Sequence, residues 1–160
     1  MPTEAMTQTV DQLYQVHHGM VFRTAYRITG NAADAEDVLQ TVFLRMVRGN
    51  PQMDNPESYL RRSAVNAALD VVRARRDSGT LEEERMAASG SCTELRELRD
   101  TLRRELSKLP PRTAEMFAMR FFEGYTNPEI AKLLGISQIV VAVTLHRTRN
   151  KLKKTMGGSR

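Results

Sequence analysis

The residues best suited to a defined task lie near the C-terminus, in residues 126–141. Ala131 is small where two helices can cross closely, Gly135 suits the left-handed end of a first helix, and Val141 is an apolar anchor further on. Ser137 has the residue type of an N-cap for a second helix. This spacing is typical of a helix-turn-helix, a motif that places its second helix in the major groove of DNA.

The second helix of this motif has an inward line and an outward face. The inward line, expected to pack inside the domain, consists of Val141, Leu145, Thr148 and Leu152. The positions expected to point toward the major groove are Gln138, Ala142, Val143, His146, Arg147, Arg149 and Asn150. A buried helical hairpin with the same spacing is the alternative interpretation, because a motif needs its context.

The charge of the surrounding sequence favours DNA. Residues 94–160 carry 14 Lys and Arg against 7 Asp and Glu, and residues 137–160 carry 6 bases and no acid. A basic run is usually a solvated face, but beside a helix-turn-helix it is suited to contact phosphates. We therefore expect the C-terminal part of the chain to bind DNA.

The composition limits the class of protein. With 160 residues, 41% of them hydrophobic, the chain can form one domain or two small ones. Its one cysteine, Cys92, excludes an internal disulfide and suits a reducing cytoplasm, and no Cys/His cluster predicts a metal site. No signal peptide or apolar run of membrane-spanning length is evident. We expect a cytoplasmic protein without membrane insertion, cofactor or metal.

A linker is expected between two all-α domains. Residues 77–93 are small, polar and acidic, with a net charge of −3 between neighbours of +1 and +7. The predicted organisation is a domain over residues 1–76, a flexible linker over 77–93 and a helix-turn-helix domain over 94–160.

Three amphipathic helices are expected before the linker. The first runs from about Thr9 to Thr29, is stopped by Gly30, and has the stripe Val10, Leu13, Tyr14, His17, Val21, Ala25 and Ile28. The second follows Asn31 as N-cap and has the stripe Ala35, Val38, Leu39, Val42, Phe43, Met46 and Val47. The third starts at Asn55 and Pro56 and has the stripe Tyr59, Leu60, Ala64, Ala67, Ala68, Val71 and Val72. His17 is interpreted as a core residue rather than a ligand.

Two polar faces of these helices have alternative interpretations. The acids Asp34, Glu36 and Asp37 either favour the positive end of the helix dipole, by about 0.3–1 kcal/mol each, or form a protein-binding face with Gln40 and Thr41. Residue types alone favour the dipole. The third helix aligns polar residues that suit either nucleic acid or plain solvent, namely Arg62, Asn66, Asp70 and Arg73, with Arg75 and Arg76 at its basic end.

At this point the chain resembles the bacterial extracytoplasmic-function sigma factors, the small initiation factors of RNA polymerase. Residues 34–45 look like their region 2.2, and residues 58–76 look like regions 2.3 to 2.4. Residues 109–126, followed by 129–137, look like region 4. The blocks occur in the expected order with a linker between them, so the resemblance covers most of the chain.

The resemblance implies a function and assigns roles to the ambiguous faces. It implies a factor that binds core RNA polymerase and directs initiation at promoters with −10 and −35 elements. Docking on the clamp helices of the β′ subunit would involve Asp34, Asp37, Gln40 and Phe43. Recognition of the −10 element would involve the loop 49–55 and Asn55, Arg61, Arg62, Asn66, Asp70, Arg73 and Arg76. Recognition of the −35 element would involve Ser137, Gln138, Ala142, Val143, His146, Arg147 and Arg149. Further partners implied are the β flap and an anti-sigma factor.

The sequence departs from the family pattern in residues 139–145. Two bases that are usual there are absent, so Ala142 and Val143 can touch thymine methyl groups but cannot donate to guanine. Alternatively, Ile139, Val140 and Val143 form an exposed patch that binds a protein. The rival function is a polymerase-independent regulator that binds an operator as a dimer. An enzyme is less well supported, because no nucleophile with its base and no phosphate-binding loop is present.

Overall fold

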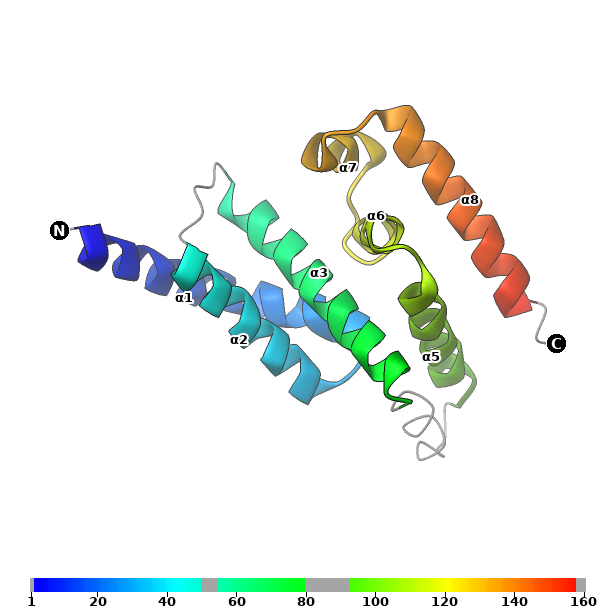
Figure 1. The fold of residues 1–160 in the computed structure, drawn as a ribbon, viewed down its shortest axis with the longest axis horizontal. Coiled ribbons are helices and arrows are strands. Elements are labelled where there is room, and N and C mark those ends of the chain that lie inside the picture. Colours follow the sequence, from blue (N-terminus) through cyan, green and yellow to red (C-terminus); the bar gives the residue numbers. More distant parts are fainter. Residues whose placement is uncertain (1, 50–54, 80–92, 158–160) are drawn as a thin grey trace. The chain divides into compact units, whose positions relative to one another are not determined.

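The computed structural model describes residues 2–49, 55–79 and 93–157. Within these ranges all regular structure is helical, which confirms the all-α prediction (Figure 1). The chain divides into two compact units, Met1–Val71 and Val72–Arg160. The predicted domain boundaries stay predictions, and most of the predicted linker lies outside the described residues.

The first unit contains α1 (Pro2–Thr29), α2 (Ala32–Gly49) and most of α3 (Pro56–Asp77). α1 begins earlier than Thr9, where the sequence predicted it, and ends at Thr29 as predicted. Gly30 stops the helix with a φ of 67°, and its N–H donates to the Tyr26 carbonyl over 2.7 Å. A left-handed conformation of this kind favours glycine.

The starts of α2 and α3 follow the predicted capping chemistry. The Asn31 side-chain oxygen accepts the backbone N–H of Asp34 over 3.0 Å. The Asn55 side-chain oxygen accepts the backbone N–H of Ser58 over 3.2 Å, and α3 then opens on Pro56. Both asparagines satisfy backbone donors that the first turn of a helix leaves without an intrahelical acceptor.

The core of the first unit follows the predicted stripes with several corrections. α1 and α2 pack against each other, and all the predicted stripe residues of α2 are buried except Val47, whose side chain is 56% exposed. Tyr14 and Tyr59 are exposed rather than buried, and His17 is half-buried. α3 also buries Val65 and Leu69, which lie off its predicted stripe.

The second unit adds α5 (Thr93–Lys108), α6 (Pro111–Phe121), α7 (Asn127–Leu134) and α8 (Gln138–Gly157). α8 packs on all three of the other helices, and α6 also packs on α7. The core is formed by Leu106, Leu109, Ala114, Met116, Phe117, Ala118, Met119, Ile130, Ala131, Leu134, Val141, Leu145 and Leu152. α8 is therefore held along one side over much of its length.

No single helix of the described part is both long and apolar enough to cross a membrane. α7 and α8 meet that length and composition only as a pair, and they are bent by 113° at the break between them. Over the same residues, no group of three or more His, Cys, Asp or Glu is placed to hold a metal ion.

Candidate nucleic-acid and protein interfaces

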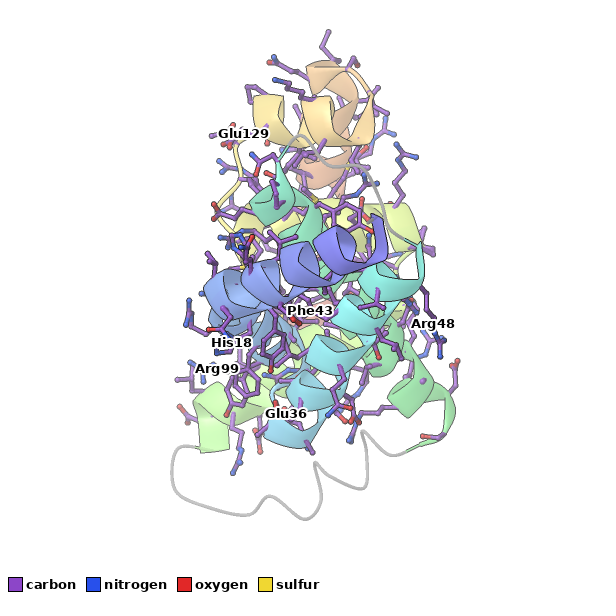
Figure 2. The ribbon with its side chains drawn as sticks, turned by 90° about the vertical axis from the view of Figure 1, so that its left-hand side faces the viewer. His18, Glu36, Phe43, Arg48, Arg99 and Glu129 are labelled. Carbon is purple, nitrogen blue, oxygen red and sulfur yellow. The ribbon has the colours of Figure 1, made fainter. Side chains whose placement is uncertain are left out.

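The start of α7 is fixed by a reciprocal pair of hydrogen bonds. The Thr126 hydroxyl accepts the backbone N–H of Glu129 over 3.3 Å, and the Glu129 carboxylate accepts the backbone N–H of Thr126 over 3.0 Å. The hydroxyl also donates to the same carboxylate over 2.9 Å. These bonds, the backbone one first, hold the pKa of Glu129 below its ordinary value of 4.5. Figure 2 shows Glu129 on this helix.

The turn between α7 and α8 has the predicted geometry. Gly135 ends α7 with φ 67° and ψ 37°, in the left-handed region. The Ile136 N–H donates to the Ala131 carbonyl over 3.0 Å, and the Ser137 hydroxyl accepts the N–H of Val140 over 3.2 Å. The bend of 113° lies in the range of a DNA-binding helix-turn-helix. The predicted roles of Gly135 and Ser137 in the turn are confirmed.

Two arginines of α6 support this motif from outside it. The Arg112 guanidinium donates to the carbonyl of Leu134 over 2.7 Å, at the end of α7 where carbonyls lack intrahelical partners. The Arg120 guanidinium donates to the carbonyl of Tyr125 over 3.0 Å, just before the start of α7. Sequence reasoning did not find either role, because the partners are backbone atoms that only the folded chain brings near.

The faces of α8 agree with the sequence prediction. The inward line of Val141, Leu145, Thr148 and Leu152 is buried. Every residue predicted for the −35 contact is exposed, namely Ser137, Gln138, Ala142, Val143, His146, Arg147 and Arg149. Asn150 is exposed too, and its amide nitrogen lies 3.2 Å from the His146 Nε2. α8 carries five Lys and Arg and no acid. This helix therefore presents a cationic face that suits phosphates.

The residues predicted to dock on polymerase are divided between surface and core. Asp37 and Gln40 are exposed on α2, whereas Asp34 is 7% exposed and Phe43 is 6% exposed. The Phe43 ring meets the Tyr14 ring of α1 edge-on at 5.0 Å. Tyr14 in turn stacks on His18 at 5.0 Å, so the Tyr14 ring contacts both of the rings labelled in Figure 2, His18 and Phe43. Direct contact with a partner is therefore available to Asp37 and Gln40, while Phe43 positions α2 against α1.

The predicted −10 residues lie on α3 and at its start. Arg61, Arg62, Asn66, Arg73 and Arg76 are half-buried, and Asn55 and Asp70 are exposed. Two of the arginines pair with carboxylates close in sequence, Arg61 with Glu57 at 2.9 Å and Arg76 with Asp77 at 3.0 Å. The loop residues 50–54 lie outside the described residues.

Two protein-family models match the chain. The family described as Sigma-70 region 2 matches residues 13–78, and the family described as Sigma-70, region 4 matches residues 99–152. The first match extends from within α1 to just beyond α3, and the second from within α5 to within α8. Each match thus coincides with the helices that carry one set of candidate interface residues.

Three curated proteins show the extent of the similarity. The ECF RNA polymerase sigma factor SigE of Mycolicibacterium smegmatis is 32% identical over 94% of this chain and 62% of its own length. SigM of Mycobacterium tuberculosis is 28% identical over 92% of this chain and 76% of its own. SigW of Bacillus subtilis is 24% identical over 90% of this chain and 87% of its own. The chain spans less than two thirds of the length of the SigE relative.

Proposed function

Because the chain belongs to the sigma-70 family, in its extracytoplasmic-function group, we propose that it binds core RNA polymerase and directs initiation at promoters with −10 and −35 elements. The observation that carries the proposal is that both matched regions fold as helical units, one of which presents an acid-free helix from a helix-turn-helix. Sigma factors are initiation factors rather than enzymes. The place of action would be the cytoplasm.

The proposed polymerase contact is the exposed face of α2. Asp37 and Gln40 would make hydrogen bonds and ion pairs with the clamp helices of the β′ subunit, with Glu36 and Thr41 beside them. Asp34 and Phe43, being buried, would act by holding the helix in place. A second contact, to the β flap, would involve the other unit, where Leu95 and Leu98 are exposed on α5.

The proposed −10 contact is α3 with the loop before it. Opening the duplex and extruding a base costs a few kcal/mol of unstacking, which protein contacts must return. Arg61, Arg62, Arg73 and Arg76 supply cations, and Asn66 and Asp70 supply polar groups. The Asn55 oxygen already accepts the Ser58 N–H, so the amide of Asn55 would act on DNA as a donor.

The proposed −35 contact is the exposed face of α8, and the resemblance also implies inhibition by an anti-sigma factor. A polymerase-independent operator regulator is less well supported, because region 2 matches as well as region 4. Such a regulator would need α1 to α3 only for dimerisation.

The experiment that tests the proposal is run-off transcription on fragmented genomic DNA of the source organism. Purified bacterial core polymerase is supplied with and without the chain, and transcript ends are mapped. New, discrete start sites with two shared upstream elements are expected. The proposal fails if the chain neither binds core polymerase nor produces new starts.

A matched pair of variants tests the docking face. Asp37→Ala combined with Gln40→Ala should weaken binding to core polymerase at least tenfold, because exposed side chains at the centre of an interface dominate its affinity. Asp11→Ala combined with Gln15→Ala removes the same two residue types from exposed positions of α1 and should leave binding unchanged. Equal binding by all three proteins, with equal helix content by circular dichroism, would remove the docking assignment.

A further inference from the structure

The solvent side of α8 carries one straight line of four exposed residues. Ile139, Val143, His146 and Asn150 recur at the spacing i, i+4, i+7, i+11, so they form a row along the helix. Each residue of the buried line, Val141, Leu145, Thr148 and Leu152, follows a residue of this row by two positions. With roughly 3.6 residues per turn, two positions correspond to about half a turn around the helix. The row therefore points directly away from the core of the second unit.

Cations lie on both sides of this row. Arg147 and Lys151 are exposed on one flank, and Arg149 and Lys153 are exposed on the other. Acidic residues are absent from α8 over its whole length, Gln138–Gly157. An uncharged central row with cations on both flanks suits a helix that lies in the major groove. The two flanks then face the two phosphate strands, and the central row faces the base edges.

The half of the row nearer the start of α8 is apolar. Ile139 is 76% exposed and Val143 is 41% exposed. The N-terminal residues of a recognition helix are those that contact base edges. The most prominent apolar group that a base pair offers in the major groove is the methyl group of thymine.

We propose that Ile139 and Val143 read the −35 element by contacting the methyl groups of neighbouring thymines. This inference rests on the proposed function. His146 and Asn150 continue the same row on polar base edges or on the backbone. Specificity then depends on thymine methyls rather than on donors to guanine. Val140, although apolar and exposed, lies on the flank with Arg147 and takes no part in this contact.

The charges favour DNA over a protein as the occupant of this apolar patch. A protein that covered Ile139 and Val143 would also come near Arg147 and Arg149, which lie about 6 and 9 Å beyond Val143 along the helix, on opposite flanks. Those cations are desolvated at a cost unless they meet anions, and the two rows of phosphates beside the major groove provide them.

The test replaces thymidine by deoxyuridine, which lacks only the methyl group. A promoter recovered by run-off transcription is synthesised with one such replacement at a time in its −35 element, and its binding to core polymerase assembled with the chain is measured. At one or two neighbouring positions, binding should weaken roughly fourfold, the value of one buried methyl-sized apolar group.

Two variants locate the contact. With Val143→Ser, which removes both methyl groups of the side chain, deoxyuridine at one of those positions should no longer weaken binding, because the two changes remove the same contact. Val140→Ser is the matched control and should keep the full sensitivity, since it makes the same chemical change on the flank. Both positions are exposed, so neither change disturbs the core.

The outcomes separate this inference from the proposed function. If the assembly initiates at promoters but no deoxyuridine weakens its binding, methyl reading is wrong while the initiation function stands, and a protein occupant of the patch becomes the better explanation. If Val143→Ser leaves the sensitivity unchanged, the assignment to Val143 is wrong. If the chain produces no promoter-specific start at all, the proposed function fails and methyl reading fails with it.

Discussion

Gly135 allows the chain to turn from α7 into α8 because its backbone adopts φ 67° and ψ 37°. An L-residue with a Cβ reaches this left-handed region only at a cost of about 1–2 kcal/mol. A Cβ at Gly135 would meet no other heavy atom within 4 Å, so a substitution there causes no steric clash. The loss of stability would come from the strained backbone conformation. This allows the conformational requirement to be measured alone.

Gly135→Ala should lower the free energy of unfolding of the second unit by about 1–2 kcal/mol. The measurement is urea unfolding of the full chain followed by circular dichroism. Gly157→Ala is the control, because Gly157 also has open space around its Cβ position but no positive φ. The control should be neutral or slightly stabilising, since alanine favours helix over glycine. Equal effects of the two changes would contradict the left-handed turn.

Glu129 makes the start of α7 sensitive to acid. Its pKa in the folded protein is below 4.5, through hydrogen bonds from the Thr126 backbone N–H and hydroxyl. A lowered folded-state pKa means that the stabilisation is present above the unfolded value and is lost as pH falls through the folded value. From neutral pH to below 4.5, wild type should therefore lose slightly more stability than Glu129→Gln, whose amide can cap without titrating. Parallel unfolding curves against pH for the two proteins would show that the carboxylate contributes nothing.

The capping residues are the part of the structure that the sequence predicts best. Asn31, Asn55, Gly135 and Ser137 act through atoms only a few residues away, so residue type and local spacing suffice. The Thr126 and Glu129 pair also follows a local signature, threonine with glutamate three residues later, although we did not predict it. Contacts between distant residues, such as that of Arg112 with Leu134, have no comparable signature.

At the scale of elements, helical periodicity predicts a face but not how far burial extends around it. Val47 continues the apolar stripe of α2 by spacing yet is exposed, although the adjacent Met46 is buried. Val65 and Leu69 lie off the predicted stripe of α3 yet are buried. Asp34 has the residue type of a surface carboxylate and is buried at the first turn of α2. In each case tertiary neighbours decide the outcome, and periodicity along one helix does not reveal them.

The proposed recognition of DNA by α8 separates into contacts that position the helix and contacts that specify sequence. Arg147 lies on a flank, so its proposed partner is a phosphate. Arg147→Ala should weaken binding and transcription at a −35-dependent promoter similarly for different −35 sequences, and should reduce the salt dependence of binding by about one phosphate contact. The measurement is binding of the polymerase assembly to promoter DNA over a range of salt concentrations.

Arg96→Ala is the control for this prediction, because it removes one exposed cation from α5 in the same unit. It should change the salt dependence less than Arg147→Ala. An unaffected promoter with Arg147→Ala would place the phosphate contact elsewhere, and a loss confined to particular −35 sequences would indicate that Arg147 contacts bases instead.

At the scale of the whole molecule, the proposed DNA contacts are divided between two units. The helix-turn-helix part carries a net charge of +7 over residues 94–160, whereas residues 1–76 carry +1. Each proposed contact is made mainly by one helix, α3 or α8, and the proposed −10 contact requires a melted duplex. Two weak DNA contacts give tight binding only when a scaffold holds them together. Once one contact has formed, the scaffold raises the effective concentration of the other contact at its DNA site. Core polymerase is the proposed scaffold.

The chain alone should therefore bind promoter DNA weakly, and core polymerase should raise its affinity at least about a hundredfold. Fluorescence anisotropy of a labelled promoter, with the chain alone, core polymerase alone and the two together, measures this gain. The variant with Asp37→Ala and Gln40→Ala should lose much of the gain while binding free DNA as weakly as wild type, because α8 is unchanged. An operator-binding regulator behaves in the opposite way, since it binds a palindrome tightly as a dimer without polymerase. Tight binding of DNA by the free chain, with no gain in affinity from core polymerase, would therefore contradict the proposed initiation function and favour the operator-binding regulator.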